Sequence, residues 1–425
     1  MIKHLYIHIP FCHRRCSYCD FNTYANMEHR IEAYVDALCA ELRMLAEEWA
    51  TTGDGRPPTD HRRPTTELPG EHRTTDYGLR PSPEAAALRP TIFLGGGTPT
   101  MLSLQQMERV LAAAAAIVPL EGAEITAEAN PGTVLGRDYL RGLRALGVNR
   151  LSMGVQSLHD PTLRMLGRIH TAEEARRSYE EAREAGFANI NLDFIFGLPG
   201  QTQAQWEQTL DTIGAWGADH FSLYSLVLEE ATPLYAQVTA GRLSLPDDDA
   251  TAAMYEAAME RLGAAGYEQY EISNWALARP EASTPKAQLP VPERACAHNL
   301  AYWLNSDYLA AGAGAHGHVY PRRYHDILGV DAYIAAVAEG RLPVAEVIEL
   351  TPQDLRAETM FMGLRLNIGV GEAHFAGRCG LSLDEAYGEV LAELVEQGLV
   401  ERSDGRVRLT PRGRMLGNRV FERFV

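Results

Sequence analysis

Short runs of aliphatic and β-branched residues alternate, over the first half of the chain, with longer stretches that repeat apolar residues every three or four positions. The short runs are typical of buried parallel strands, and the longer periodicity is typical of amphipathic helices. The predicted strands are 5–9, 91–94, 123–127, 150–153, 190–196 and 221–226, and the predicted helices are 31–50, 104–118, 137–146, 172–185 and 203–216. Six strands that alternate with helices predict an α/β fold, a partial (β/α)6 barrel with functional loops at the carboxyl ends of its strands.

The pattern changes in the second half of the chain. Residues 248–266 predict a further helix, and the sequence YEQYEIS that follows predicts a strand. Near the C-terminus, a predicted amphipathic helix over 384–397 precedes a hairpin with a tight turn at Asp404-Gly405. Thr410 and Pro411 then suit the start of a final helix. This order of helix, hairpin and helix predicts a winged-helix-like α+β module.

The chain therefore divides into three predicted parts. Residues 1–240 form the barrel, residues 241–345 extend it, and residues 346–425 form the C-terminal module. Residues 51–90 interrupt the barrel pattern, because they are rich in Thr, Pro, Arg and Gly and lack aliphatic periodicity. Such a composition predicts a surface insertion that is disordered over much of its length.

The charge and hydropathy of the chain bear on whether it binds nucleic acid or spans a membrane. The 425 residues include 39 Lys and Arg against 56 Asp and Glu, a net charge of −17, which argues against nucleic acid as the main partner. No run of about 18 apolar residues predicts a transmembrane helix. No signal-peptide pattern is visible at the N-terminus, so we predict a cytoplasmic protein, with peripheral membrane contact left open.

Three of the six cysteines lie within eight residues, as Cys12, Cys16 and Cys19 in a C-x3-C-x2-C spacing. Three thiolates can hold a [4Fe–4S] cluster and leave its fourth iron open for S-adenosylmethionine (SAM), whose reductive cleavage yields a deoxyadenosyl radical. The alternative is structural zinc, which needs four closed ligands, commonly in C-x2-C pairs. The chain has no second pair, so the spacing favours the cluster.

Polar residues follow several of the predicted strands. GGGTPT, with Gly96, Gly97 and Thr98, can bring backbone N–H and C=O groups close to a ligand. Glu128, Gln156 and Asp193 recur at or near successive strand ends, in ITAEANPG, LSMGVQS and LDFIFGLPG. Each alone can be a satisfied buried hydrogen bond, but their recurrence predicts one shared pocket. Arg168, in LGRIH, either binds a carboxylate there or lies on the surface.

Together with YIHIPFC-x3-C-x2-C and LDFIFGLPGQT, these motifs resemble the coproporphyrinogen III oxidase-like, HemN-related family of radical SAM proteins. The resemblance runs from Met1 nearly to Val425, apart from the 51–90 insertion. It implies a radical SAM barrel, a HemN-like C-terminal module, a [4Fe–4S] cluster and SAM. The residues that it assigns to SAM are Tyr6, Tyr18, Gly96, Gly97, Thr98, Glu128, Gln156, Arg168 and Asp193. Several of these positions belong to a second SAM site in the oxidase, so the number of SAM molecules that this chain binds, one or two, is left open.

Within this family the chain resembles the heme chaperones of the HemW type more than the oxygen-independent coproporphyrinogen III oxidase. Phe21 stands where the oxidase pattern has a fourth cysteine, and only eleven residues precede Cys12. The resemblance implies that the chain binds heme, transfers it to acceptor hemoproteins, takes electrons from a donor such as a flavodoxin or ferredoxin, and lacks the oxidase activity. Radical SAM decarboxylation in porphyrin biosynthesis is the alternative.

A third feature is the segment CAHNLAYW, which resembles the H-N-x-x-Y-W motif of these chaperones. It implies a heme site at His298, Asn299, Tyr302 and Trp303, since imidazole is a common axial ligand of heme iron. Taken alone, a histidine beside aromatics such as His298 is more often a packed core residue, and Cys296 is the alternative ligand if heme is attached through sulfur. In the glycine-rich segment GAGAHGH, which predicts a tight turn near the pocket, His316 is either a ligand or a loop residue.

Overall fold

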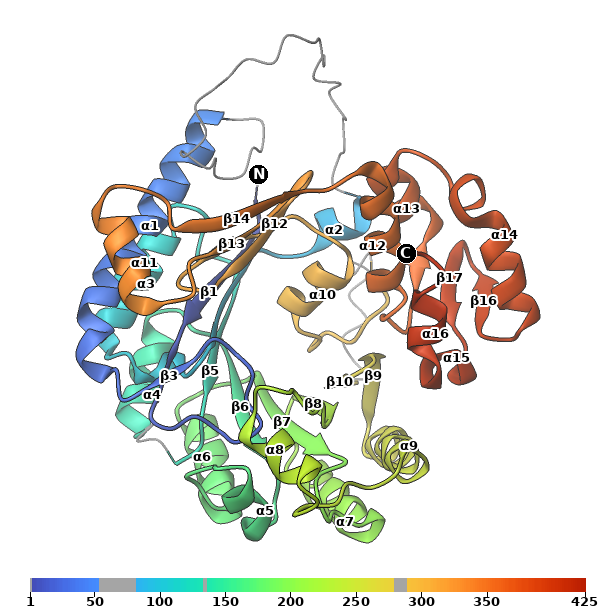
Figure 1. The fold of residues 1–425 in the computed structure, drawn as a ribbon, viewed down its shortest axis with the longest axis horizontal. Coiled ribbons are helices and arrows are strands. Elements are labelled where there is room, and N and C mark those ends of the chain that lie inside the picture. The colour runs from blue at the N-terminus through green and yellow to red at the C-terminus, as the bar shows by residue number, and fades with distance from the viewer. Residues whose placement is uncertain (1, 53–81, 133–135, 279–288) are drawn as a thin grey trace.

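The computed structural model describes residues 2–52, 82–132, 136–278 and 289–425. Its largest element is a nine-stranded sheet, in which six neighbouring parallel strands follow each other in chain order (Figure 1). Across the sheet the strands are β11 Leu309–Ala311, β1 His4–Ile9, β4 Thr91–Gly96, β5 Glu124–Ala129, β6 Arg150–Gln156, β7 Ile190–Phe196, β8 His220–Ser225, β10 Asn274–Leu277 and β9 Tyr267–Glu271. Each of the six predicted barrel strands overlaps one of β1 and β4–β8, so the α/β prediction is confirmed.

Helices cover the outer face of this curved sheet, and Figure 1 shows them as an arc from α1 to α7. Their bounds are α1 Ile31–Thr52, α3 Leu104–Ala114, α4 Arg137–Ala145, α6 Ala172–Glu184 and α7 Gln203–Gly214, with the shorter α5 Asp160–Met165 and α8 Pro233–Thr239 nearby. Ser103, Thr171 and Thr202 each cap a helix in a capping box, which satisfies backbone N–H groups at the helix start. These local signals explain why three of the five predicted helices, α3, α6 and α7, begin where the sequence predicts.

Strands on both edges extend the barrel. β11 pairs in parallel with β1, while β10 and β9 add an antiparallel pair beyond β8, after the helix α9 Asp248–Ala264. A second, three-stranded antiparallel sheet consists of β12 His316–Val319, β13 Arg322–Asp326 and β14 Val344–Glu349. It lies next to β1 in Figure 1, between α10 Ala297–Trp303 and α11 Val330–Ala338. The sequence analysis did not predict this second sheet.

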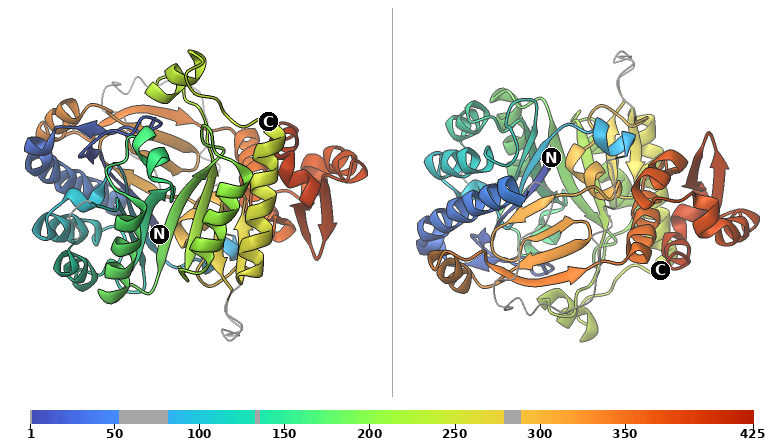
Figure 2. Two further views of the ribbon diagram at one scale, coloured as in Figure 1. Left: turned by 90° about the horizontal axis from the view of Figure 1, so that it is seen from below. Right: turned by 90° about the horizontal axis from the view of Figure 1, so that it is seen from above.

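The C-terminal residues build a module with its own hydrophobic core, to one side of the barrel in both views of Figure 2. Its elements are α12 Pro352–Gly363, β15 Val370–Gly371, α13 Glu372–Cys379, α14 Leu383–Glu396, β16 Val400–Ser403, β17 Arg406–Leu409, α15 Pro411–Met415 and α16 Gly417–Phe421. The predicted hairpin is confirmed, and Asp404 and Gly405 both take the left-handed conformation that its turn requires. Thr410 caps α15 as predicted.

Most of the predicted 51–90 insertion lies outside the described residues, so its disorder stays a prediction. The short helix α2 Pro83–Ala87 follows it and packs against the C-terminal module, where Glu84 pairs with Arg406. None of the described helices is long and apolar enough to cross a membrane.

Candidate functional site

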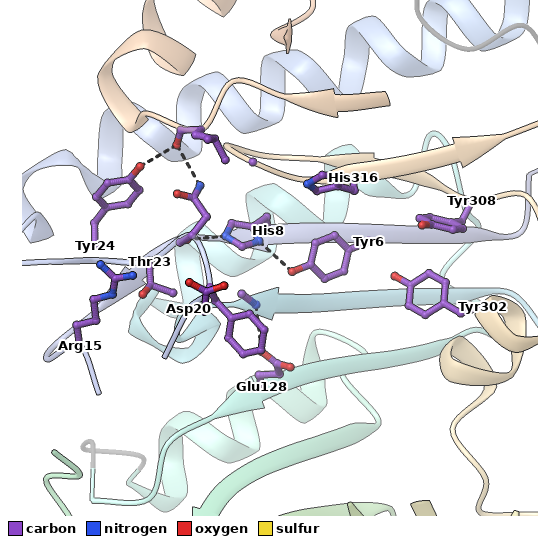
Figure 3. A pocket seen from close by; sticks show the side chains of 15 residues that line it. Tyr6, His8, Arg15, Asp20, Thr23, Tyr24, Glu128, Tyr302, Tyr308 and His316 are labelled. Carbon is purple, nitrogen blue, oxygen red and sulfur yellow. Dashed lines mark hydrogen bonds between the residues drawn. The ribbon is translucent and has the colours of Figure 1, made fainter. Parts of the chain in front are cut away.

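A cavity of about 690 Å³ opens at the carboxyl ends of β1, β4 and β5. Its wall combines the loop after Cys12 with aromatic and imidazole side chains from both sheets (Figure 3). The residues lining it are Tyr6, His8, Arg15, Asp20, Phe21, Asn22, Thr23, Tyr24, Gly96, Glu128, Tyr302, Tyr308, Gly314, His316 and Leu328. Segments far apart in the sequence, 6–24, 96–128 and 302–328, thus meet around one space.

Strand β1 brings two polar side chains to this cavity. Leu5 and Ile7 are fully buried in the hydrophobic core, and the alternate residues Tyr6 and His8 border the cavity. The His8 Nδ1 lies 2.9 Å from the Tyr6 hydroxyl, and its Nε2 lies 2.9 Å from the Asn22 carbonyl oxygen. The sequence analysis missed His8, although a polar residue at every second position of an otherwise apolar strand was a usable signal.

The glycine turn after β4 fits closely against the cysteine loop. Gly96 has a φ of +105°, and a Cβ there would collide with the His8 ring. A Cβ on Gly97 would lie 2.6 Å from the Phe11 carbonyl oxygen. The Thr98 N–H donates a hydrogen bond of 2.8 Å to that same oxygen. These positions therefore need glycine for close backbone approach.

Cys12, Cys16 and Cys19 are half-buried on this loop, and none forms a disulfide. The Arg168 guanidinium reaches the Cys16 sulfur at 3.5 Å, and the Thr98 hydroxyl lies 3.6 Å from the Cys12 sulfur. Burial raises the pKa of the Cys12 thiol to about 11. Hydrogen-bond donors beside sulfur are the surroundings that stabilise cluster thiolates, so these residues fit a [4Fe–4S] cluster.

Among the described residues, no three His, Cys, Asp or Glu side chains are grouped as ligands of a single metal ion, so the choice between zinc and a cluster rests on the cysteine spacing. Arg168 itself turns inward, where its Nη2 donates to Asn130 Oδ1 at 2.6 Å and to the Gly154 carbonyl oxygen at 2.5 Å. Arg168 is therefore not a free surface side chain, and its binding of a ligand carboxylate stays a prediction.

The other residues assigned to SAM surround the same end of the barrel. Glu128 accepts a 3.0 Å hydrogen bond from the Gly96 N–H, and burial beside Asp193 raises the pKa of Glu128 to about 8. Asp193 accepts hydrogen bonds from Asn191 and Ser152, and burial raises its pKa as well.

Gln156 ends β6 at a register shift and has a φ of +70°. Residues other than glycine rarely adopt this left-handed conformation, and those that do are concentrated at ligand sites. Tyr18 packs among Leu166, Leu198 and Leu234 rather than along the cavity wall.

The residues assigned to heme are divided by the fold. His298 is only 1% exposed on α10, and its ring nitrogens lie 2.7 Å from the Thr91 hydroxyl and 2.8 Å from the Tyr302 hydroxyl. Tyr302 lines the cavity, whereas Trp303 packs beneath the Arg365 guanidinium, 4.7 Å from its ring. Neither Asn299 nor the fully buried Cys296 borders the cavity.

Phe21, the residue that departs from the oxidase pattern, is 69% exposed at the cavity edge. Single exposed apolar side chains are normal on folded proteins, so Phe21 alone does not identify a binding surface.

Comparison with known proteins shows which families this chain resembles. Residues 6–213 match the radical SAM superfamily, and residues 350–416 match the HemN C-terminal domain. The chain is 38% identical to the heme chaperone HemW of Bacillus subtilis, over 100% of this chain and 99% of that protein. It is 35% identical to the HemW of Lactococcus lactis, over 99% and 96% of the two chains.

Among solved structures, coproporphyrinogen III oxidase (HemN) from Escherichia coli shares the fold, with a TM-score of 0.75. It is 24% identical to this chain, and the match covers 100% of this chain and 90% of the oxidase chain. The sequence identity to the two HemW proteins, 38% and 35%, is higher than the 24% identity to the oxidase. The chain belongs to the HemW family of the radical SAM superfamily.

Proposed function

We propose that this chain binds heme and transfers it to acceptor hemoproteins. The observation that carries the proposal is the cavity of about 690 Å³ beside the cysteine loop, large enough for a rigid aromatic ligand and walled by Tyr and His side chains. Two bacterial proteins that match this chain over its full length are named heme chaperones.

We further propose that the resident cofactors lie at the inner side of this cavity. Cys12, Cys16 and Cys19 would hold the [4Fe–4S] cluster, which with SAM supplies one-electron and radical chemistry when bound. The remaining residues act on SAM by hydrogen bonding and shape, and the set is Tyr6, Tyr18, Gly96, Gly97, Thr98, Glu128, Gln156, Arg168 and Asp193. A flavodoxin or ferredoxin would serve as the electron donor.

Within the motif assigned to heme, Tyr302 is the residue that borders the cavity, and we propose that it contacts the porphyrin. His298 would act by holding the Tyr302 hydroxyl, since the two side chains lie 2.8 Å apart. Asn299 and Trp303 would support α10 from its other side. The three-part division at residues 240 and 345 would place this motif in the barrel extension.

The competing function is oxidative decarboxylation of coproporphyrinogen III. The chain shares its fold with HemN. The sequence resemblance implies a cysteine in the oxidase where this chain has Phe21, which argues against the oxidase chemistry. A single pair of assays separates the two functions.

The test reconstitutes the protein anaerobically and runs both assays on the same preparation. Hemin is titrated while the Soret band is followed, and coproporphyrinogen III is incubated with SAM and reductant while carbon dioxide release is measured. We expect stoichiometric hemin binding without decarboxylation. Rapid carbon dioxide release, or the absence of saturable hemin binding, would contradict the proposal.

A further inference from the structure

Five histidines lie in or behind the cavity wall, and they differ in whether a ring nitrogen is free to bind iron. His8 and His298 have both nitrogens in hydrogen bonds. His325 is held by the Glu346 carboxylate at 3.2 Å and by the Asp326 carbonyl oxygen. His318 is 1% exposed, so its unpartnered nitrogens are inaccessible. None of these four presents an available nitrogen to the cavity.

His316 is the exception. Every residue from 309 to 319 is buried apart from His316, which is exposed and lines the cavity (Figure 3). Its ring makes no hydrogen bond with any other described residue. A neutral imidazole binds a metal through a ring nitrogen that is free and accessible, and His316 has such a nitrogen at the cavity.

The second sheet fixes the position of this ring. His316 and His325 are cross-strand partners on β12 and β13, and their ring centroids lie 5.1 Å apart. Glu346 on β14 holds His325 in turn. Burial and the neighbouring His325 and Arg323 lower the pKa of His316, which keeps the imidazole neutral near pH 7, as a ligand must be.

The rest of the cavity mouth suits a porphyrin. Phe21 is 69% exposed and Leu328 is 53% exposed, so two apolar side chains are available to cover the ring faces. Arg15 supplies a cation for a propionate carboxylate. The phenols of Tyr6, Tyr302 and Tyr308 are poor alternatives as ligands, because burial raises their pKa values and keeps them protonated.

We propose that His316 is the axial ligand of the heme iron, in the cavity between the barrel mouth and the β12–β14 sheet. This inference rests on the proposed heme-binding function. It assigns the iron to a residue outside the His298 motif, and it makes His325 a positioning residue that acts through His316.

The test uses the full-length, cluster-reconstituted protein and hemin as the probe. Hemin is titrated into the wild type, His316→Ala, His316→Cys, His298→Ala and His325→Phe, with His29→Ala as a control because His29 is exposed but does not line the cavity. Circular dichroism and the cluster absorbance show which variants are folded. Soret and electron paramagnetic resonance spectra report the axial ligand.

We expect His316→Ala to lose the imidazole-ligated spectrum and to raise the hemin Kd by about tenfold or more. Added imidazole should restore that spectrum, because it can enter the exposed position that the side chain leaves. His316→Cys should change the spectrum to that of thiolate ligation. His298→Ala should weaken binding but keep the wild-type ligand spectrum, and His325→Phe should do the same because it keeps an aromatic contact.

A wild-type spectrum in folded His316→Ala, with loss of the imidazole signature in His298→Ala, would overturn this inference and leave heme binding intact. Failure of the wild type to bind hemin would instead overturn the proposed function, and this inference with it. A measurement without substitutions gives a second check. Hemin should protect His316 from carbethoxylation, read by mass spectrometry, and equal modification with and without hemin would contradict the assignment.

Discussion

The turn that precedes His316 is supported by a buried carboxyl group. Glu41 on α1 accepts a 2.9 Å hydrogen bond from the Gly312 N–H and another from the Tyr333 hydroxyl on α11. The buried Asp326 carboxyl interacts with Glu41, and burial raises the pKa of Glu41 to about 7. Glu41 thus stays protonated in the folded protein at a pH where an unfolded glutamate is ionised.

This raised pKa predicts that stability falls as the pH rises. Stabilisation from the bound proton is complete below about pH 4.5, the unfolded value, and is lost as the pH approaches 7. The lost free energy of unfolding should be about 3 kcal/mol. In urea titrations from pH 4.5 to 8, Glu41→Gln should flatten this fall and be more stable than the wild type at pH 8. The exposed Glu389→Gln is the control and should keep the wild-type profile.

Close backbone contact at Gly97 leads to a second prediction. A methyl group there would meet the carbonyl oxygens of Phe11 at 2.6 Å and of Ile9 at 2.8 Å, so Gly97→Ala must push the cysteine loop away. We expect about 2 kcal/mol lower stability and less iron and sulfide per chain after reconstitution. Gly136→Ala, which meets no atom within 4 Å, should retain both. Full iron content in Gly97→Ala would show that the loop adapts.

Helices and barrel strands were predictable because local signals specify them. The capping boxes at Ser103, Thr171 and Thr202 mark helix starts, and the apolar runs of β4–β8 match strands buried on both faces. The β12–β14 sheet was not predictable in this way. The sequence HGHVYPRRYHD has neither continuous apolar character nor clean alternation, and its pairing depends on contacts with distant residues.

The cysteine loop and the glycine turn were recognisable in the sequence from the C-x3-C-x2-C spacing and from GGGTPT, and the cluster itself stays a prediction. The roles of the histidines were not recognisable in this way, because they depend on which nitrogens are already bonded. His298 shares a motif with Tyr302, yet Thr91 and Tyr302 engage its ring. His316 lies in a segment that predicts only a turn, and its exposure follows from the strand that begins there.

The contact between α2 and the C-terminal module gives a third prediction. Glu84 and Arg406 form a 2.5 Å ion pair that is 13% and 17% exposed, and Arg406 also donates to two carbonyl oxygens. Arg406→Leu leaves Glu84 partly buried without its partner and should cost about 2 kcal/mol of unfolding free energy. Arg423→Leu, which breaks a more exposed pair with Glu393, should cost less than about 0.5 kcal/mol. Equal losses in the two variants would mean that the Glu84 pair adds nothing.

The charge of the whole chain bears on the C-terminal module, whose helix and hairpin order is also found in DNA-binding proteins. A net charge of −17 opposes approach to a phosphate backbone. We expect no saturable binding of duplex DNA in fluorescence anisotropy, even at low ionic strength. Affinity that rises steeply as salt is removed would instead indicate that the module presents a local basic surface.

Hydrogen bonds join the segment just after the cysteines to residues 313–328 on the opposite side of the cavity. The Asn22 side chain donates to the carbonyl oxygens of Ala313 and Leu328, at 2.8 and 3.0 Å, and the Tyr24 hydroxyl donates to the same Leu328 oxygen. These bonds join segments some 290 residues apart, so we expect the opening of one segment to favour the opening of the other. Hydrogen–deuterium exchange can check this. Binding of the [4Fe–4S] cluster or of heme should slow exchange of the backbone amides in both segments. Slower exchange confined to one of the two segments would show that they open independently.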